Sequence, residues 1–168
     1  MSTDKHLIEQ VAEGDEMAFR TLYDRYSERT LRYVYTLLRN RHLAEDVVQD
    51  TMVAVWRGAG RFAGRSKVST WIFGIARNKA LDLLRREKRG ERVPDTPLVS
   101  PDPAPGIQRD ERVKAALQTL SEDHREVVFL TFYEHLSYAE IGRLLGVPEG
   151  TVKSRMFHAK KKLAEALA

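Results

Sequence analysis

The chain has 168 residues, of which 42% are hydrophobic and 31% charged, with a formal net charge of +4 and no cysteine. The lack of cysteine excludes disulfides, thiol nucleophiles and thiolate metal sites, and no apolar run approaches the roughly 20 residues of a membrane span. The first residues, MSTDKHLIEQ, are polar and acidic and unlike a secretory signal. We therefore expect a helix-rich cytoplasmic protein without direct membrane insertion.

Charge is unevenly distributed along the chain. Residues 1–56 carry 7 Lys/Arg and 10 Asp/Glu, and residues 57–92 carry 11 and 3. Residues 93–149 carry 5 and 10, and residues 150–168 carry 5 and 1. Two separate basic segments are typical of a protein that contacts nucleic acid at two places. The alternative is that each is a solvated basic helix face.

The N-terminal part of the chain has the apolar spacing of helices near 4–13, 15–38, 43–58 and 67–89. In the third of these, a core-facing row is expected at Leu43, Val47, Thr51 and Val55. A different, acidic face is formed by Asp46, Gln49 and Asp50 together with Val53. Because this face would repel DNA, it is either a protein-binding surface or an ordinary solvated one.

The segment FAGRSKVSTWIFGIARNKALDLLRREKR, residues 62–89, interleaves aromatic and basic side chains. This composition suits single-stranded DNA, whose bases stack on rings while cations follow the backbone. We expect the helix to bury Val68, Ile72, Ile75 and Leu83 and to present Asn78, Asp82, Arg85 and Arg86 together on another side. We expect Trp71 and Phe73 in the core, which leaves Phe62 in the loop as the better candidate for contact with a base.

Five of the six prolines fall between Pro94 and Pro105. Proline lacks an amide donor and disfavours helical backbone at the residue before it, so this segment is predicted to be an extended linker. The prediction is an all-α chain with one domain at 1–92, a linker at 93–107 and a second domain of four helices at 108–168.

The second domain is predicted to have helices near 108–119, 122–134, 137–145 and 149–166, with Ser121 as the start signal of the second. Within LSYAEIGRLLGVPEGTVKSRMFHAKKKL, residues 136–163, Ser137 and Glu140 have the spacing of a capping box. Gly146 suits the left-handed end of one helix and Pro148 the first turn of the next. These signals predict a helix-turn-helix whose second helix can enter a DNA major groove.

That second helix has a narrow apolar stripe formed by Val152, Met156, Ala159 and Leu163. Its other sides carry Thr151, Ser154, His158 and Lys162, flanked by Lys153, Arg155, Phe157, Lys160 and Lys161. Arginine and lysine can donate hydrogen bonds to guanine or phosphate, and hydroxyls can bind phosphate. DNA binding is favoured over a purely structural helical hairpin.

The sequence offers no catalytic set. The five histidines, His6, His42, His124, His135 and His158, have no paired ligand spacing. There is no phosphate-binding Gly-rich loop and no nucleophile elbow. We expect no metal, no cofactor and no enzymatic activity.

Three blocks of the chain together resemble the extracytoplasmic-function (ECF) subfamily of bacterial sigma factors. They are LAEDVVQDTMVAVWR, FAGRSKVSTWIFGIARNKALDLLRR and, after the Pro-rich linker, LSYAEIGRLLGVPEGTVKSRMFHAKKKL. The resemblance runs from about residue 19 to residue 163 and keeps the family's order. It implies two helical domains, conventionally domains 2 and 4, that direct RNA polymerase to promoters.

The resemblance also implies roles for individual residues. The match to the surface that binds the β′ clamp helices of core RNA polymerase comprises Asp46, Gln49 and Asp50. The match to the surface that binds the minus-ten element comprises Phe62, Lys67, Trp71, Arg77, Asn78, Lys79, Arg85 and Arg86. Within it, the loop from Phe62 to Lys67 and Asn78 match positions that capture a flipped base.

In the second domain, the match to the helix that binds the minus-thirty-five element comprises Thr151, Lys153, Ser154, Arg155, Phe157, His158 and Lys160. Domain 4 of the family also contacts the β flap of the polymerase. Many relatives carry arginine where this chain has Thr131 and His158, so both positions weaken phosphate or guanine contacts. The family is usually inhibited by an anti-sigma factor, often a membrane protein, that covers the polymerase-binding surfaces.

Three other classes of protein fit parts of the sequence. A stand-alone helix-turn-helix regulator would dimerise on a palindrome. A site-specific recombinase or other DNA-processing enzyme would need the catalytic set that the chain lacks. An adaptor would use its basic faces for protein partners alone.

Overall fold

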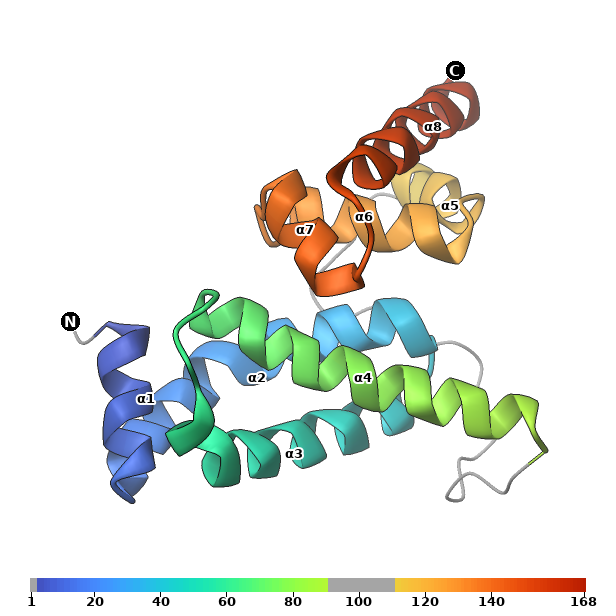
Figure 1. The fold of residues 1–168 in the computed structure, drawn as a ribbon. Coiled ribbons are helices and arrows are strands. Elements are labelled where there is room, and N and C mark those ends of the chain that lie inside the picture. Colours follow the sequence, from blue (N-terminus) through green and yellow to red (C-terminus); the bar gives the residue numbers. More distant parts are fainter. Residues whose placement is uncertain (1–2, 91–110) are drawn as a thin grey trace. The chain divides into compact units, whose positions relative to one another are not determined.

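The computed structural model describes residues 3–90 and 111–168, which fall in two compact units, Met1–Asp102 and Pro103–Ala168 (Figure 1). Across these two described ranges there are eight α-helices, one short 3-10 helix and no strand, which confirms the all-α prediction. The predicted linker at 93–107 and the predicted domain boundaries lie outside the described residues.

The first unit is built from four α-helices and a 3-10 turn. These are α1 (Asp4–Ala12), α2 (Glu16–Leu38), α3 (Arg41–Gly58), η1 (Ala59–Arg61) and α4 (Val68–Lys88). The central helix α2 packs against α1, α3 and α4. Asp15 caps α2 by accepting hydrogen bonds from two backbone amides, and Asn40 caps α3 by accepting one from Leu43 N at 3.1 Å. The Asn40 cap explains why α3 begins two residues before the expected start.

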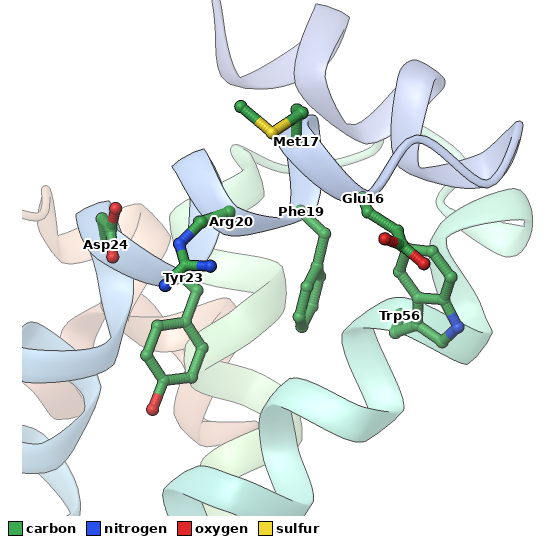
Figure 2. A pocket seen from close by; sticks show the side chains of 7 residues that line it. All are labelled: Glu16, Met17, Phe19, Arg20, Tyr23, Asp24 and Trp56. Atoms are coloured by element: carbon green, nitrogen blue, oxygen red, sulfur yellow. The ribbon is translucent and has the colours of Figure 1, made fainter.

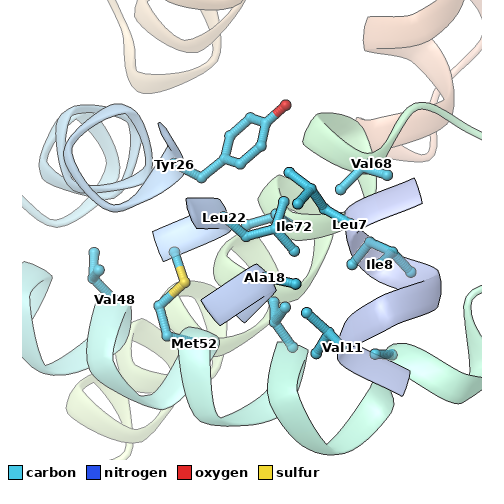
Figure 3. Packing of buried hydrophobic residues seen from close by; sticks show 12 residues of the cluster. Leu7, Ile8, Val11, Ala18, Leu22, Tyr26, Val48, Met52, Val68 and Ile72 are labelled. Carbon is cyan, nitrogen blue, oxygen red and sulfur yellow. The ribbon is translucent and has the colours of Figure 1, made fainter. Parts of the chain in front are cut away.

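The core of the first unit lies where α1, α2, α3 and α4 meet (Figure 3). Leu22, Val55 and Ile72 are among its fully buried side chains. At the edge of the core, Asp4 in α1 accepts hydrogen bonds from Arg25, at 2.8 Å, and from the hydroxyl of Tyr26. This cluster attaches the N-terminal helix to α2.

Two apolar positions of α4 differ from expectation. Val68, Ile72 and Phe73 are buried as predicted, whereas Ile75 and Leu83 are only half-buried. Ile75 lies off the buried stripe of the helix and packs against the edge of the core. Leu83 follows Ala80, which is the last buried residue of α4, so no deep core remains for it to enter.

The second unit contains α5 (Glu111–Gln118), α6 (Glu122–Phe132), α7 (Tyr138–Leu145) and α8 (Glu149–Leu167). α8 packs against the other three helices. Val127, Leu130, Ile141, Val152 and Met156 are almost completely buried. The predicted position of α5 from residue 108 falls partly outside the described residues.

The turn between α7 and α8 has the predicted signals. Ser137 and Glu140 form both hydrogen bonds of the capping box, and Gly146 has a φ of 71°, a left-handed conformation that glycine adopts without strain. Pro148 is the N-cap of α8 and not a residue of its first turn. Gly142 is needed for close packing, because a Cβ there would lie 2.8 Å from the carbonyl oxygen of Val147.

Candidate functional site

The face of α3 that carries Asp46, Gln49 and Asp50 is exposed. The opposite row is buried as predicted, with Val55 and Thr51 fully enclosed. The Thr51 hydroxyl donates to the Val47 carbonyl at 2.7 Å, so its burial leaves no polar atom unsatisfied. Within residues 3–90 and 111–168, Asp46 and Asp50 form no ion pair, whereas their neighbour Glu45 pairs with Arg41 at 3.0 Å. The two carboxylates are thus available to a cationic partner.

A hollow of about 600 Å³ lies between α2 and the end of α3 (Figure 2). Its lining residues are Glu16, Met17, Phe19, Arg20, Tyr23, Asp24 and Trp56. Met17 is 75% exposed and Trp56 is 37% exposed. The rings of Phe19 and Trp56 meet edge to face, with centroids 5.3 Å apart.

The hollow adjoins the acidic face of α3. Gln49 Nε2 donates to the Tyr23 hydroxyl at 3.2 Å, and Tyr23 lines the hollow. A second, smaller depression along α2 and α3 shares Tyr23 and is also lined by Gln49. Met17, Phe19 and Trp56 were not among the predicted site residues. One signal in the sequence could have indicated this hollow. Trp56 follows Val53 by three positions, which places a large aromatic side chain on the exposed side of an amphipathic helix.

The aromatic residues before and within α4 are mutually packed. Phe73 is buried as expected. Phe62 is half-buried against Trp71, with ring centroids 5.1 Å apart, and both rings pack against the edge of the core. Trp71 also lies 3.7 Å from the position of a Cβ at Gly58. Phe62 was predicted to be a loop residue available to a base. In the structure its ring also packs against the ring of Trp71.

The polar side of α4 is exposed at Asn78, Asp82 and Arg85, one helical turn apart. Arg85 lies 3.9 Å from Asp82, and both side chains are more than half exposed. Arg77, Lys79 and Arg86 are half-buried on the flanks of the helix, and Lys67 is exposed just before it. The structure therefore brings most of the basic positions proposed for the minus-ten surface onto one helix.

In α8 the predicted stripe is buried at Val152, Met156 and Ala159 and half-buried at Leu163. The predicted contact residues that are exposed are Lys153, Ser154, Phe157, His158 and Lys160, with Phe157 at 66%. Thr151 is half-buried. Arg155 is also half-buried, and its guanidinium lies 3.8 Å from Asp123 of α6.

Thr131 is half-buried near the end of α6. Its hydroxyl donates to the Val127 carbonyl at 2.7 Å and lies 3.6 Å from the sulfur of Met156. The side chain therefore contributes to the packing of α6 against α8.

Across residues 3–90 and 111–168, no group of three or more His, Asp or Glu side chains could hold a metal ion. Over the same residues, no helix is long and apolar enough to cross a membrane.

Comparison with known proteins assigns both units. Residues 22–90 match the model of sigma-70 region 2, and residues 110–163 match that of sigma-70 region 4. The chain is 32% identical to the RNA polymerase sigma-H factor of Pseudomonas aeruginosa, over 98% of this chain and 93% of that protein. It is 36% identical to the ECF RNA polymerase sigma factor SigM of Mycobacterium tuberculosis, over 98% of this chain and 85% of that one.

Solved structures agree with this assignment. The sigma factor RpoE from Bartonella quintana, determined in complex with the anti-sigma factor NepR, is 30% identical, with a TM-score of 0.70 over 89% of this chain and 96% of that one. CnrH, determined in complex with the cytosolic domain of CnrY, is 27% identical, with a TM-score of 0.72 over 99% of this chain and 97% of that one. The chain therefore belongs to the ECF subfamily of RNA polymerase sigma factors, with regions 2 and 4.

Proposed function

We propose that this chain binds core RNA polymerase and directs it to promoters, without catalysing a reaction itself. Its first unit melts and binds the minus-ten element, and its second unit binds the minus-thirty-five element. The proposal rests on one observation. A single chain with sigma regions 2 and 4 has an exposed acidic face on α3, exposed and half-buried basic side chains on α4, and an exposed basic face on α8. The acidic face would repel DNA, so a protein partner accounts for it better than a second DNA contact does.

The polymerase-binding surface in this proposal comprises the acidic face of α3 and the hollow beside it. Asp46 and Asp50 supply negative charge for the β′ clamp helices, and Trp56 with Phe19 supplies apolar area. Apolar and charged groups side by side suit a partner helix with one apolar and one basic face. The β flap is the proposed partner of the second unit.

Substitution of Asp50 tests this surface. Asp50→Arg should weaken binding to purified core polymerase by about tenfold or more, because a buried like-charge contact costs several kcal/mol at an interface. Glu9→Arg makes the same charge change at an exposed position of α1 and should bind like the wild type. Equal losses in both variants would show that overall charge, and not this face, determines binding.

The minus-ten surface in this proposal comprises the loop from Phe62 to Lys67, with Trp71, and the polar side of α4, with Arg77, Asn78, Lys79, Arg85 and Arg86.

Asn78 is exposed and has no hydrogen-bond partner within the described ranges, so its amide can meet the edge of an unpaired base. Asn78→Ala should abolish open-complex formation while binding to core polymerase persists. Loss of core binding in this variant would mean that α4 faces the polymerase.

The minus-thirty-five surface in this proposal is α8, where the exposed residues are Lys153, Ser154, Phe157, His158 and Lys160 and the half-buried ones are Thr151 and Arg155. Arg155 and His158 also contact side chains of α6. Basic residues on a helix supported by a buried stripe fit the major groove. An anti-sigma factor is a further proposed partner, because the similar sigma factor RpoE was determined in complex with the anti-sigma factor NepR.

Transcription with purified core polymerase on a promoter library tests the whole proposal. Addition of the chain should produce starts at a defined set of promoters. If the chain produced no such starts, or formed a dimer on a palindrome without polymerase, the sigma function would be excluded.

A further inference from the structure

The first turn of α6 lies beside the DNA-facing side of α8. Ser121 caps α6 by accepting a hydrogen bond from the backbone amide of His124 at 3.3 Å, which fixes the first turn. α6 packs against α8. Two side chains of this turn, Asp123 and His124, each meet a residue of α8 that the sigma resemblance places at the DNA.

The first of these contacts is between Asp123 and Arg155. The Arg155 guanidinium lies 3.8 Å from the Asp123 carboxylate, and its side chain is 24% exposed whereas that of Asp123 is 67% exposed. An exposed pair at this distance contributes little to stability. It does restrict an arginine that would otherwise sample many rotamers.

The second contact is between two imidazole rings. His124 and His158 stack with centroids 6.3 Å apart and an interplanar angle of 18°. The His158 ring also meets the exposed Phe157 ring, with centroids 5.4 Å apart and an interplanar angle of 79°. His158 therefore contacts one ring of α6 and one ring of its own helix.

We propose that Asp123 and His124 are positioning residues that fix Arg155 and His158 for sequence-specific contact with duplex DNA. This inference rests on the proposed function, in which α8 binds the upstream promoter element. A side chain with one orientation can meet one base edge well, whereas a mobile one can use phosphates or several bases with similar energy. The start of α6 then determines specificity through α8.

The chain offers a matched control for the acidic residue. Glu122 is exposed, carries the same charge and lies in the same turn, and it forms no ion pair in the described part of the chain. Loss of either carboxylate reduces repulsion from DNA, so overall affinity should rise slightly in both Glu122→Gln and Asp123→Asn. Only Asp123→Asn should change which sequences are preferred.

The experiment uses the full chain with core polymerase and a library of duplexes randomised over the upstream region, with bound DNA sequenced. The wild type and Glu122→Gln should enrich the same motif. In Asp123→Asn, preference at one or two base pairs should fall about three- to tenfold, since a good arginine–base contact discriminates by at least about fivefold. In the Arg155→Ala background, Asp123→Asn should have no further effect on preference.

Ring substitutions test the second contact. His124→Ala should relax preference at a position that His158→Ala also affects, and His124→Phe, which restores a stacking ring, should recover it. Thermal unfolding of each variant measures its stability. If His124 had a purely structural role, its substitution would lower the stability without changing the base preference.

The outcomes separate this inference from the function on which it rests. If the wild-type holoenzyme enriched no upstream motif, the proposed function of the second unit would be wrong. If the wild type enriched a motif and Asp123→Asn and His124→Ala kept it unchanged, the positioning role would be overturned. An additive effect of Asp123→Asn and Arg155→Ala would also overturn it, because Asp123 would then act independently of Arg155.

Discussion

The two units place their exposed polar faces differently relative to their cores. In the first unit the acidic face lies on α3 and the basic face on α4, and other sides of these helices enter a core shared with α1 and α2. In the second unit a single helix, α8, carries both the buried stripe and the basic face, and it contacts all three other helices. The first unit therefore divides its acidic and basic faces between two helices, whereas the second unit carries its basic face on the helix that contacts its three other described helices.

The largest effect is expected at Met156, which is 1% exposed in α8. Met156→Ala should lower the free energy of unfolding of the second unit by about 2–5 kcal/mol, as is usual for removal of a buried large side chain. Phe157→Ala, at the next and mostly exposed position, should change it by less than about 0.5 kcal/mol while weakening DNA binding. Urea unfolding followed by circular dichroism measures the first effect. Similar losses in both variants would contradict the separation of the two faces of α8.

The second prediction concerns pH and the first unit. Burial, followed by the hydrogen bond to the Asp4 carboxylate, raises the pKa of Tyr26 from 10.0 to about 12. Because the folded-state pKa is raised, the stabilisation is fully present below pH 10 and is lost as pH rises toward 12. Over this window Tyr26 should account for a loss of about 2–3 kcal/mol.

Tyr26→Phe isolates this contribution, because the variant lacks the titrating phenol. The difference in unfolding free energy between wild type and variant should shrink between pH 10 and pH 12. A constant difference across the window would show that the phenol titrates equally in both states. The second unit should show no such change on this substitution.

The third prediction compares two glycines of the helix-turn-helix. Gly142→Ala should destabilise the second unit by about 1–3 kcal/mol, because the new Cβ would meet the Val147 carbonyl, which is backbone and cannot rotate away. Gly150→Ala meets nothing within 4 Å and lies in the first turn of α8, so it should be neutral or stabilise by up to about 1 kcal/mol. Thermal unfolding of both variants measures the contrast, and equal shifts would argue against the close approach at Gly142.

The smallest effects are expected at helix caps in the two units. Ser137→Ala removes one bond of the capping box and should cost about 1 kcal/mol. Thr3→Ala removes the single cap bond of α1, which has a length of 3.2 Å, and should cost about 0.5 kcal/mol. Hydrogen exchange of the first-turn amides should locate each loss. A larger effect at Thr3 would mean that α1 depends on its cap more than on its buried face.

Local signals in the sequence were enough to predict the helices. Apolar periodicity and the caps at Ser121, Ser137 and Gly146 depend on neighbours within one or two turns, and the structure confirms them. The core row of α3 was predicted for the same reason. Leu83 was misjudged because its burial depends on where the core ends along α4, which the periodicity of that helix does not show. Ile75 was misjudged because it lies at the edge of the buried stripe, where packing with the other helices decides burial.

In the candidate sites too, features within one segment were predicted and contacts between helices were not. The residue types and order of the acidic face, the basic helix and the helix-turn-helix indicated a sigma factor, because each lies within a continuous segment. The hollow lined by Phe19 and Trp56 joins side chains from two helices, as does the contact between Asp123 and Arg155. No spacing along the chain predicts such pairs.

By itself, then, the sequence determined the helical class, the approximate bounds of the helices and the family, since these depend on local periodicity, capping and contiguous motifs. Only the tertiary structure determined which surface side chains contact residues of another element. It packed Phe62 against Trp71 and brought Arg155 and His158 beside the first turn of α6. The physical reason is that the conformations open to a side chain depend on its contacts. Packing makes those contacts with groups that are distant in the sequence.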